Sequence, residues 1–189
     1  MTTGHITVVN TNNEDAMTMT VNSITSSGAG NLDIDMINTE DDLTLTITGA
    51  MDIGGTLNFT NADEASDSAG ILDIGGSSTV DGTTTLVGAD DGATTMNVAG
   101  ASATFTGVTS LNDDTGLASL VFDGTVAQTV TFGAAVGGAG AAEGTIDVAN
   151  TTEAVTFDGA IGSGTNLKEI EVSASAEAVF KSTIAAITV

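Results

Sequence analysis

Acidic side chains are the groups in this chain that could do chemistry, and they recur at regular intervals. The 189 residues include 25 Asp and Glu against two Lys and no Arg, a formal net charge of −23. One acid from each cluster gives a series with gaps of 26, 26, 24, 23 and 29 residues: Asp15, Asp41, Asp67, Asp91, Asp114 and Glu143. Because Ca²⁺ prefers oxygen ligands from Asp, Asn and turn carbonyls, this periodicity predicts calcium binding at acidic turns.

The candidate metal ligands are aspartates in these recurring clusters. They are Asp15, Asp41, Asp42, Asp67, Asp90, Asp91, Asp113 and Asp114. Two unit charges ~4.8 Å apart repel by about 1 kcal/mol in water and by roughly 3–4 kcal/mol at an effective dielectric of 20. A stacked column of carboxylates would therefore be stabilised by a bridging cation. The alternative is a solvated acidic edge that keeps the protein soluble and blocks strand pairing.

Known calcium motifs and catalytic motifs are not matched. The solenoid calcium repeat begins at Gly137 but has Ala142 where Asp is required, and no EF-hand loop occurs. His5 is the single histidine, and Cys, Trp and Tyr are absent, so thiolate chemistry and the aromatic platforms of a glycosidase are missing. We expect no enzymatic activity, no catalytic residue and no organic cofactor.

The charge balance also bears on partners. Phosphate binding needs a Lys/Arg footprint that this chain lacks, so we expect no nucleic-acid partner. No apolar run approaches the ~18 residues of a spanning helix, so we expect no membrane insertion. A Thr column for ice binding is not sustained, because Thr20 and Thr46 are followed at equivalent positions by Asp73 and Asn97.

Short strands must position these acids, and strand-like units recur along the sequence at a long and nearly constant interval. Alternation is clear in residues 17–21 and 43–47, where apolar residues alternate with Thr. The last apolar residue of each such unit recurs with gaps of 26, 27, 24, 24, 26 and 24: Val21, Ile47, Ile74, Val98, Phe122, Val148 and Val172. A second series lies between them, with gaps of 25, 27, 19, 27, 25 and 23: Ile34, Phe59, Leu86, Phe105, Phe132, Phe157 and Phe180.

Two interleaved strand series of nearly equal period predict an all-β parallel β-solenoid. The seven members of each series predict about seven coils with two main strands per coil. The interval is nearly constant because each coil must match neighbours ~4.8 Å away. A β-sandwich, or a tandem of small sandwiches, is the alternative that evenly spaced short strands also allow. The acidic turns would then stack along one edge. No linker divides the chain, so residues 1–189 are expected to form one solenoid domain.

Residues 103–189 carry a resemblance. The run Val155-Thr156-Phe157-Asp158-Gly159-Ala160-Ile161-Gly162, followed by Leu167-Lys168-Glu169-Ile170-Glu171-Val172, resembles the β-strand repeats of large bacterial surface proteins. Residues 132–137 with 146–148 form a looser copy, and residues 117–122 match the second half. The resemblance implies an adhesin, a surface-layer protein or an extracellular filament.

These observations together predict a structural protein outside the cell. The lack of Cys is typical of bacterial or archaeal surface material, and the chain reads as a segment or processed subunit of a larger surface protein. We expect a self-assembling subunit of a prokaryotic surface layer or filament, whose partner is itself, in a homopolymer or array. The alternative is a passive stalk of a large cell-surface adhesin, in contact with a cell-surface polysaccharide or a host surface.

Overall fold

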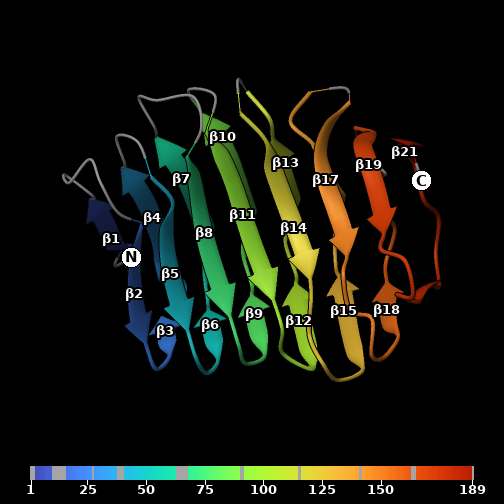
Figure 1. Ribbon diagram of the computed structural model, residues 1–189, viewed down its shortest axis with the longest axis horizontal. Coiled ribbons are helices and arrows are strands. Elements are labelled where there is room, and N and C mark those ends of the chain that lie inside the picture. The colour runs from blue at the N-terminus through green and yellow to red at the C-terminus, as the bar shows by residue number, and fades with distance from the viewer. Residues whose placement is uncertain are drawn as a thin grey trace.

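The computed structural model is built from β-strands, and the part of the chain that it describes contains no helix (Figure 1). It describes residues 3–9, 16–26, 28–37, 41–62, 68–89, 92–114, 116–140, 142–162 and 165–188. Strand β5 (Leu43–Ile47) is representative, since its three apolar side chains are buried while its two threonines face outward. The predicted period-two alternation thus sets one face of each strand against a core.

The strands form three sheets. Sheet I contains β1 (Thr3–Val9), β4 (Asn31–Ile37), β7 (Leu57–Ala62), β10 (Thr84–Ala89), β13 (Thr109–Asn112) and β16 (Val136–Gly138). Sheet II contains β2 (Met17–Val21), β5, β8 (Ala69–Ile74), β11 (Ala93–Val98), β14 (Ala118–Phe122), β17 (Glu143–Val148), β19 (Leu167–Val172) and β21 (Ala186–Thr188). Sheet III contains β3 (Ile24–Ser26), β6 (Met51–Ile53), β9 (Ser78–Val80), β12 (Ser102–Phe105), β15 (Gln128–Phe132), β18 (Val155–Asp158) and β20 (Ala178–Phe180).

The chain visits the three sheets in turn and then begins the next coil. Among the described residues every strand pairing is parallel, such as β2 with β5 and β5 with β8. The coils stack in sequence order along the long axis, from blue β1 and β2 to red β19 and β21 (Figure 1). The parallel β-solenoid is confirmed, with about six complete turns against the seven expected. Sandwiches would need antiparallel neighbours, which these pairings do not contain.

The first sequence series is confirmed in register. Its seven residues belong to successive strands of sheet II and are paired across every coil boundary: Val21, Ile47, Ile74, Val98, Phe122, Val148 and Val172. The constant interval therefore measures one full turn of the solenoid.

The second series divides between two sheets, because each of the first six coils has three described strands and not two. Ile34, Phe59 and Leu86 lie in sheet I and pair with one another. The remaining members, Phe105, Phe132, Phe157 and Phe180, lie in sheet III. The short gap of 19 residues after Leu86 marks the change of sheet. It arises because the large apolar residue that makes the signal lies in sheet I in the early coils and in sheet III in the later ones.

The four phenylalanines of sheet III form a stack inside the coils. Ring centroids lie 5.5 Å apart for Phe105–Phe132, 6.3 Å for Phe132–Phe157 and 5.0 Å for Phe157–Phe180, with nearly parallel planes. Phe122 of sheet II meets Phe157 edge-on at 5.4 Å. Such pairs contribute roughly 0.5–1.5 kcal/mol each beyond their buried area. The stacked pairs join successive strands of sheet III, and the Phe122–Phe157 pair joins sheet III to sheet II.

Glycine is required where the chain turns from sheet III to sheet I. A Cβ on Gly82 would lie 2.6 Å from the backbone carbonyl oxygen of Gly55, the equivalent glycine one coil earlier. Gly82 also donates its backbone N–H to that carbonyl at 2.8 Å. The absence of a side chain at Gly82 is what allows this close backbone approach at the coil corner.

Candidate functional site

The acidic candidates lie in the segments that connect sheet I to sheet II, which we call the I–II corners. Asp41 and Asp42 directly precede β5, and Asp113 and Asp114 directly follow β13. The other four candidates fall outside the described residues: Asp15, Asp67, Asp90 and Asp91. The structure therefore places two of the predicted pairs, in the second and fifth coils.

Two of these carboxylates accept hydrogen bonds from the first residue of a sheet II strand. Asp42 Oδ1 accepts from the backbone N–H of Ala69, which begins β8 one coil later, at 2.9 Å. Asp113 Oδ1 accepts from the backbone N–H of Ala118, which begins β14, at 2.9 Å. Each carboxylate thus satisfies a backbone donor at a strand start, which is a structural use of the acid.

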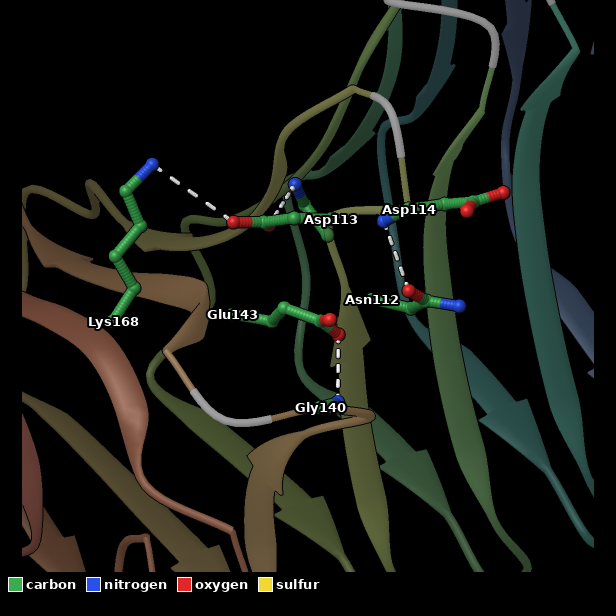
Figure 2. Close-up of polar contacts among 7 residues, drawn as sticks. Asn112, Asp113, Asp114, Gly140, Glu143 and Lys168 are labelled. Atoms are coloured by element: carbon green, nitrogen blue, oxygen red, sulfur yellow. Dashed lines mark hydrogen bonds and ion pairs between the residues drawn. The ribbon is translucent and has the colours of Figure 1, made fainter.

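The corner around Asp113 contains further contacts (Figure 2). Lys168 Nζ lies 3.9 Å from Asp113 Oδ2, an ion pair that spans from the seventh coil to the fifth. Glu143 Oε2 accepts from the Gly140 backbone N–H at 2.7 Å, and Asn112 Oδ1 accepts from the Asp114 backbone N–H at 2.9 Å. Asp113 and Asp114 point in opposite directions (Figure 2), so the two adjacent carboxylates do not converge on one point.

Register also separates the two pairs of candidates. Leu43, Gly70, Thr94 and Ala118 occupy equivalent positions in successive strands of sheet II. Asp42 lies one residue before its strand, whereas Asp113 lies five residues before Ala118. The clusters share a period along the chain but differ in their position within the corner. Within the described ranges, no three or more His, Cys, Asp or Glu residues are close enough to hold a metal ion. Calcium binding remains a prediction that depends mainly on the four undescribed aspartates.

A second acidic group lies on the outer face of sheet II. One outward position in successive strands is occupied by Thr20, Thr46, Asp73, Asn97, Val121, Asp147 and Glu171. Asp73 Oδ1 accepts from Asn97 Nδ2 at 2.9 Å. The same arrangement occurs in sheet I, where Asp33 Oδ1 accepts from Asn58 Nδ2 at 2.6 Å. A neutral amide beside a carboxylate in the next coil avoids like-charge contact.

Asp147 and Asp123 are electrostatically unusual. Burial raises the pKa of Asp147, with added repulsion from Glu171 and Asp123. Burial likewise raises the pKa of Asp123, with repulsion from Asp73 and an opposing backbone hydrogen bond. Asp147 Oδ1 is buried without a hydrogen-bond partner. The sequence signal for this group is an acid centred between apolar residues in the Leu72-Asp73-Ile74 and Ile146-Asp147-Val148 units, a pattern that identifies the strand but not the electrostatic coupling.

The described pockets are small. One of about 170 Å³ is lined by Thr151, Thr152, Glu153, Ala154, Ser175 and Glu177, and a second of about 80 Å³ opens beside β13 and β16. Ligand sites for small organic molecules are typically about 300–1,000 Å³.

Comparisons with protein-family models, with curated proteins and with solved structures find no match to this chain. Among the described residues there is no helix of the length and apolarity that would cross a bilayer.

Proposed function

We propose that this chain is a structural protein of the prokaryotic cell surface, a self-assembling subunit of a surface layer or filament. The observation that supports it best is the parallel ladder itself. It runs through eight strands of sheet II, and its outermost strands, β2 and β21, each have a partner on one side only among the described residues. An uncovered strand edge is a template for pairing with another chain.

The exposed core at the ends supports the same proposal. Met19 of β2 is 42% exposed, although it occupies the inward position at which its neighbour Leu45 is fully buried. Phe180, the last ring of the phenylalanine stack, is only partly buried. Burying apolar surface yields about 25 cal/mol per Å², so covering these ends would favour association.

A catalytic role is not part of the proposal. Three acids in or next to the I–II corners, Asp42, Asp113 and Glu143, each accept a hydrogen bond from a backbone amide. Carboxylates used in this way stabilise corners. Calcium, if bound at these corners, would reduce repulsion between coils and between neighbouring molecules.

The alternative function is a passive stalk in a large surface adhesin. It is favoured by the charge, because residues 1–166 carry a net −22 and contain no Lys or Arg. Such a surface repels lateral neighbours at low ionic strength, which suits an isolated rod better than a two-dimensional array.

Electron microscopy of the purified chain separates the two functions. Samples would be prepared at low and at physiological ionic strength, each with calcium and with EDTA. Filaments or ordered arrays would support the subunit. Short isolated rods under all four conditions would rule it out and favour the stalk.

A further inference from the structure

The last coils differ in charge from the rest of the molecule. Both lysines, Lys168 and Lys181, lie in the last 23 residues, whose net charge is −1. Residues 1–53, the part of the sequence that contains the strands of the first two coils, include eight acids and no Lys or Arg. A contact between two first coils would bring two strongly anionic ends together. The nearly neutral end is the surface that an anionic first coil can approach at least cost.

Among the described strands, those of sheet II extend furthest in the direction of the later coils. β21 lies one coil beyond β20, the last strand of sheet III, and two coils beyond β16, the last strand of sheet I. Its Ile187 is 62% exposed. At the opposite end of the same sheet, β2 has partly exposed inward residues, including Met17 and Met19.

The register through sheet II specifies how these two edges would meet. One outward position runs through all eight strands: Thr18, Thr44, Ile71, Thr95, Ser119, Thr145, Glu169 and Thr188. Continuing this ladder by one strand brings Thr188 of one copy beside Thr18 of the next. It also brings Ile187 beside Met17, so that the exposed apolar residues of the two ends cover each other.

Resting on the proposed function, we propose that copies of this chain join head to tail, with the β21 edge of one copy pairing in parallel with the β2 edge of the next. The occupant of each end is therefore a second copy of the same chain. The contact is heterologous and does not close on itself, so repetition gives a filament. A tail-to-tail dimer would pair β21 with itself and leave Met17 and Met19 uncovered.

Cysteine cross-linking tests the contact in a chain that contains no native cysteine. Neighbouring strands lie ~4.8 Å apart, within the Cα separation that a disulfide accepts. The intrachain pair Thr18→Cys with Thr44→Cys is the positive control, because these residues already face each other in adjacent strands. An equal mixture of Thr18→Cys and Thr188→Cys chains in a redox buffer is the test.

Head-to-tail pairing predicts covalent dimers in the mixture and none from either variant alone. A chain that carries both Thr18→Cys and Thr188→Cys should give a ladder of covalent multimers. Dimers from Thr188→Cys alone would overturn the proposal in favour of tail-to-tail contact. If the mixture fails to cross-link while sedimentation shows association, the contact is wrong but the proposed function stands. A chain that stays monomeric with and without calcium at every ionic strength would overturn both.

A second pair of variants tests the edge without cysteine. Ile187→Asp puts a charge on an exposed residue of β21 and should abolish association in sedimentation. Val126→Asp is the matched control, since Val126 is 47% exposed but lies in the fifth coil, between β14 and β15. Equal association of the two variants would overturn the proposal.

Discussion

Asn58 of β7 donates its side-chain amide to Asp33 of β4, one coil earlier, at 2.6 Å. The two residues are direct partners in the register of sheet I. A contact between residues 25 apart in sequence thus depends only on the length of one turn.

Removing the carboxylate of Asp42 should destabilise the solenoid. Asp42→Ala leaves the Ala69 amide without its acceptor, and we expect a loss of about 0.5–1 kcal/mol in the free energy of unfolding. Asp42→Asn keeps an oxygen acceptor and should cost less. The measurement is chemical denaturation, with Asp114→Ala as control because the hydrogen bond described there uses the backbone amide of Asp114. Equal losses for Asp42→Ala and Asp114→Ala would contradict the role.

Two buried threonines should respond to valine in opposite directions. Thr84 is fully buried and its hydroxyl has no hydrogen-bond partner, so Thr84→Val should stabilise the fold by up to about 1 kcal/mol. Thr94 is equally buried, but its hydroxyl donates to the Val87 carbonyl at 2.6 Å and accepts from the Asn61 backbone N–H at 3.3 Å. Thr94→Val should therefore cost about 1–3 kcal/mol. Thermal melts of the two variants check the difference in sign.

The raised pKa values of Asp123 and Asp147 predict that these two carboxyls destabilise the folded state more at neutral pH than in acid. A carboxyl whose pKa is higher in the folded state binds more protons there. Its favourable contribution is therefore full at low pH and is lost as the pH rises from the usual value of 3.8 through the raised pKa.

Asp147→Asn should thus raise the melting temperature at pH 7 and change it less at pH 4, with the largest difference at low salt. Asp81→Asn, at an exposed position in the turn between β9 and β10, is the control for a general reduction in charge. If the two variants gain equally at pH 7, overall charge and not local coupling explains the effect.

Two glycines separate the cost of lost space from the cost of backbone strain. Gly82→Ala would force a Cβ against the Gly55 backbone, with no flexible side chain to move aside. We expect a loss of about 3 kcal/mol or failure to fold. Gly28 has a φ of +64°, and a Cβ added to it would meet no neighbouring heavy atom within 4 Å. Gly28→Ala should therefore cost roughly 1–2 kcal/mol from strain alone. Chemical denaturation measures both variants, and similar losses would contradict the stacked corner.

Chelation tests the calcium prediction. If the acidic turns bind Ca²⁺, adding EDTA at low ionic strength should lower the melting temperature, and adding calcium should restore it, whereas magnesium should restore less. A melting temperature unchanged by EDTA at low salt would refute calcium binding. If EDTA does lower the melting temperature, Asp113→Asn and Asp41→Asn would show whether the ion is bound at one of the described corners.

Most of the fold can be predicted from the interval at which apolar residues recur. A run such as Leu43-Thr44-Leu45-Thr46-Ile47 identifies its buried face directly, and a constant interval to Ile74 requires one turn per repeat. The third strand of a coil leaves a weaker pattern in the sequence. Strands such as β3 and β6 are only three residues long, too short for alternation to distinguish them from a corner.

The candidate site was less predictable for a physical reason. Strand register is fixed by burial, because a slip of one residue moves every side chain to the opposite face. Corners have no such constraint, so an acid can move from the start of a corner, as at Asp113, to its end, as at Asp42, without disturbing the core. Sequence intervals alone do not resolve that shift. The coupling of Asp147 to Asp123 depends on burial, which becomes visible only in three dimensions.

The ladder through Thr18, Thr44 and Ile71 has a consequence for how this molecule could change over time. Each coil contacts chiefly the coil before it and the coil after it. A duplicated stretch of 24 to 27 residues would therefore add one coil and shift the later coils along the axis without changing their structure. Each added rung would extend the rod by ~4.8 Å. Its reach is therefore a quantity that evolution or an engineer could set by copying, in steps of fixed size.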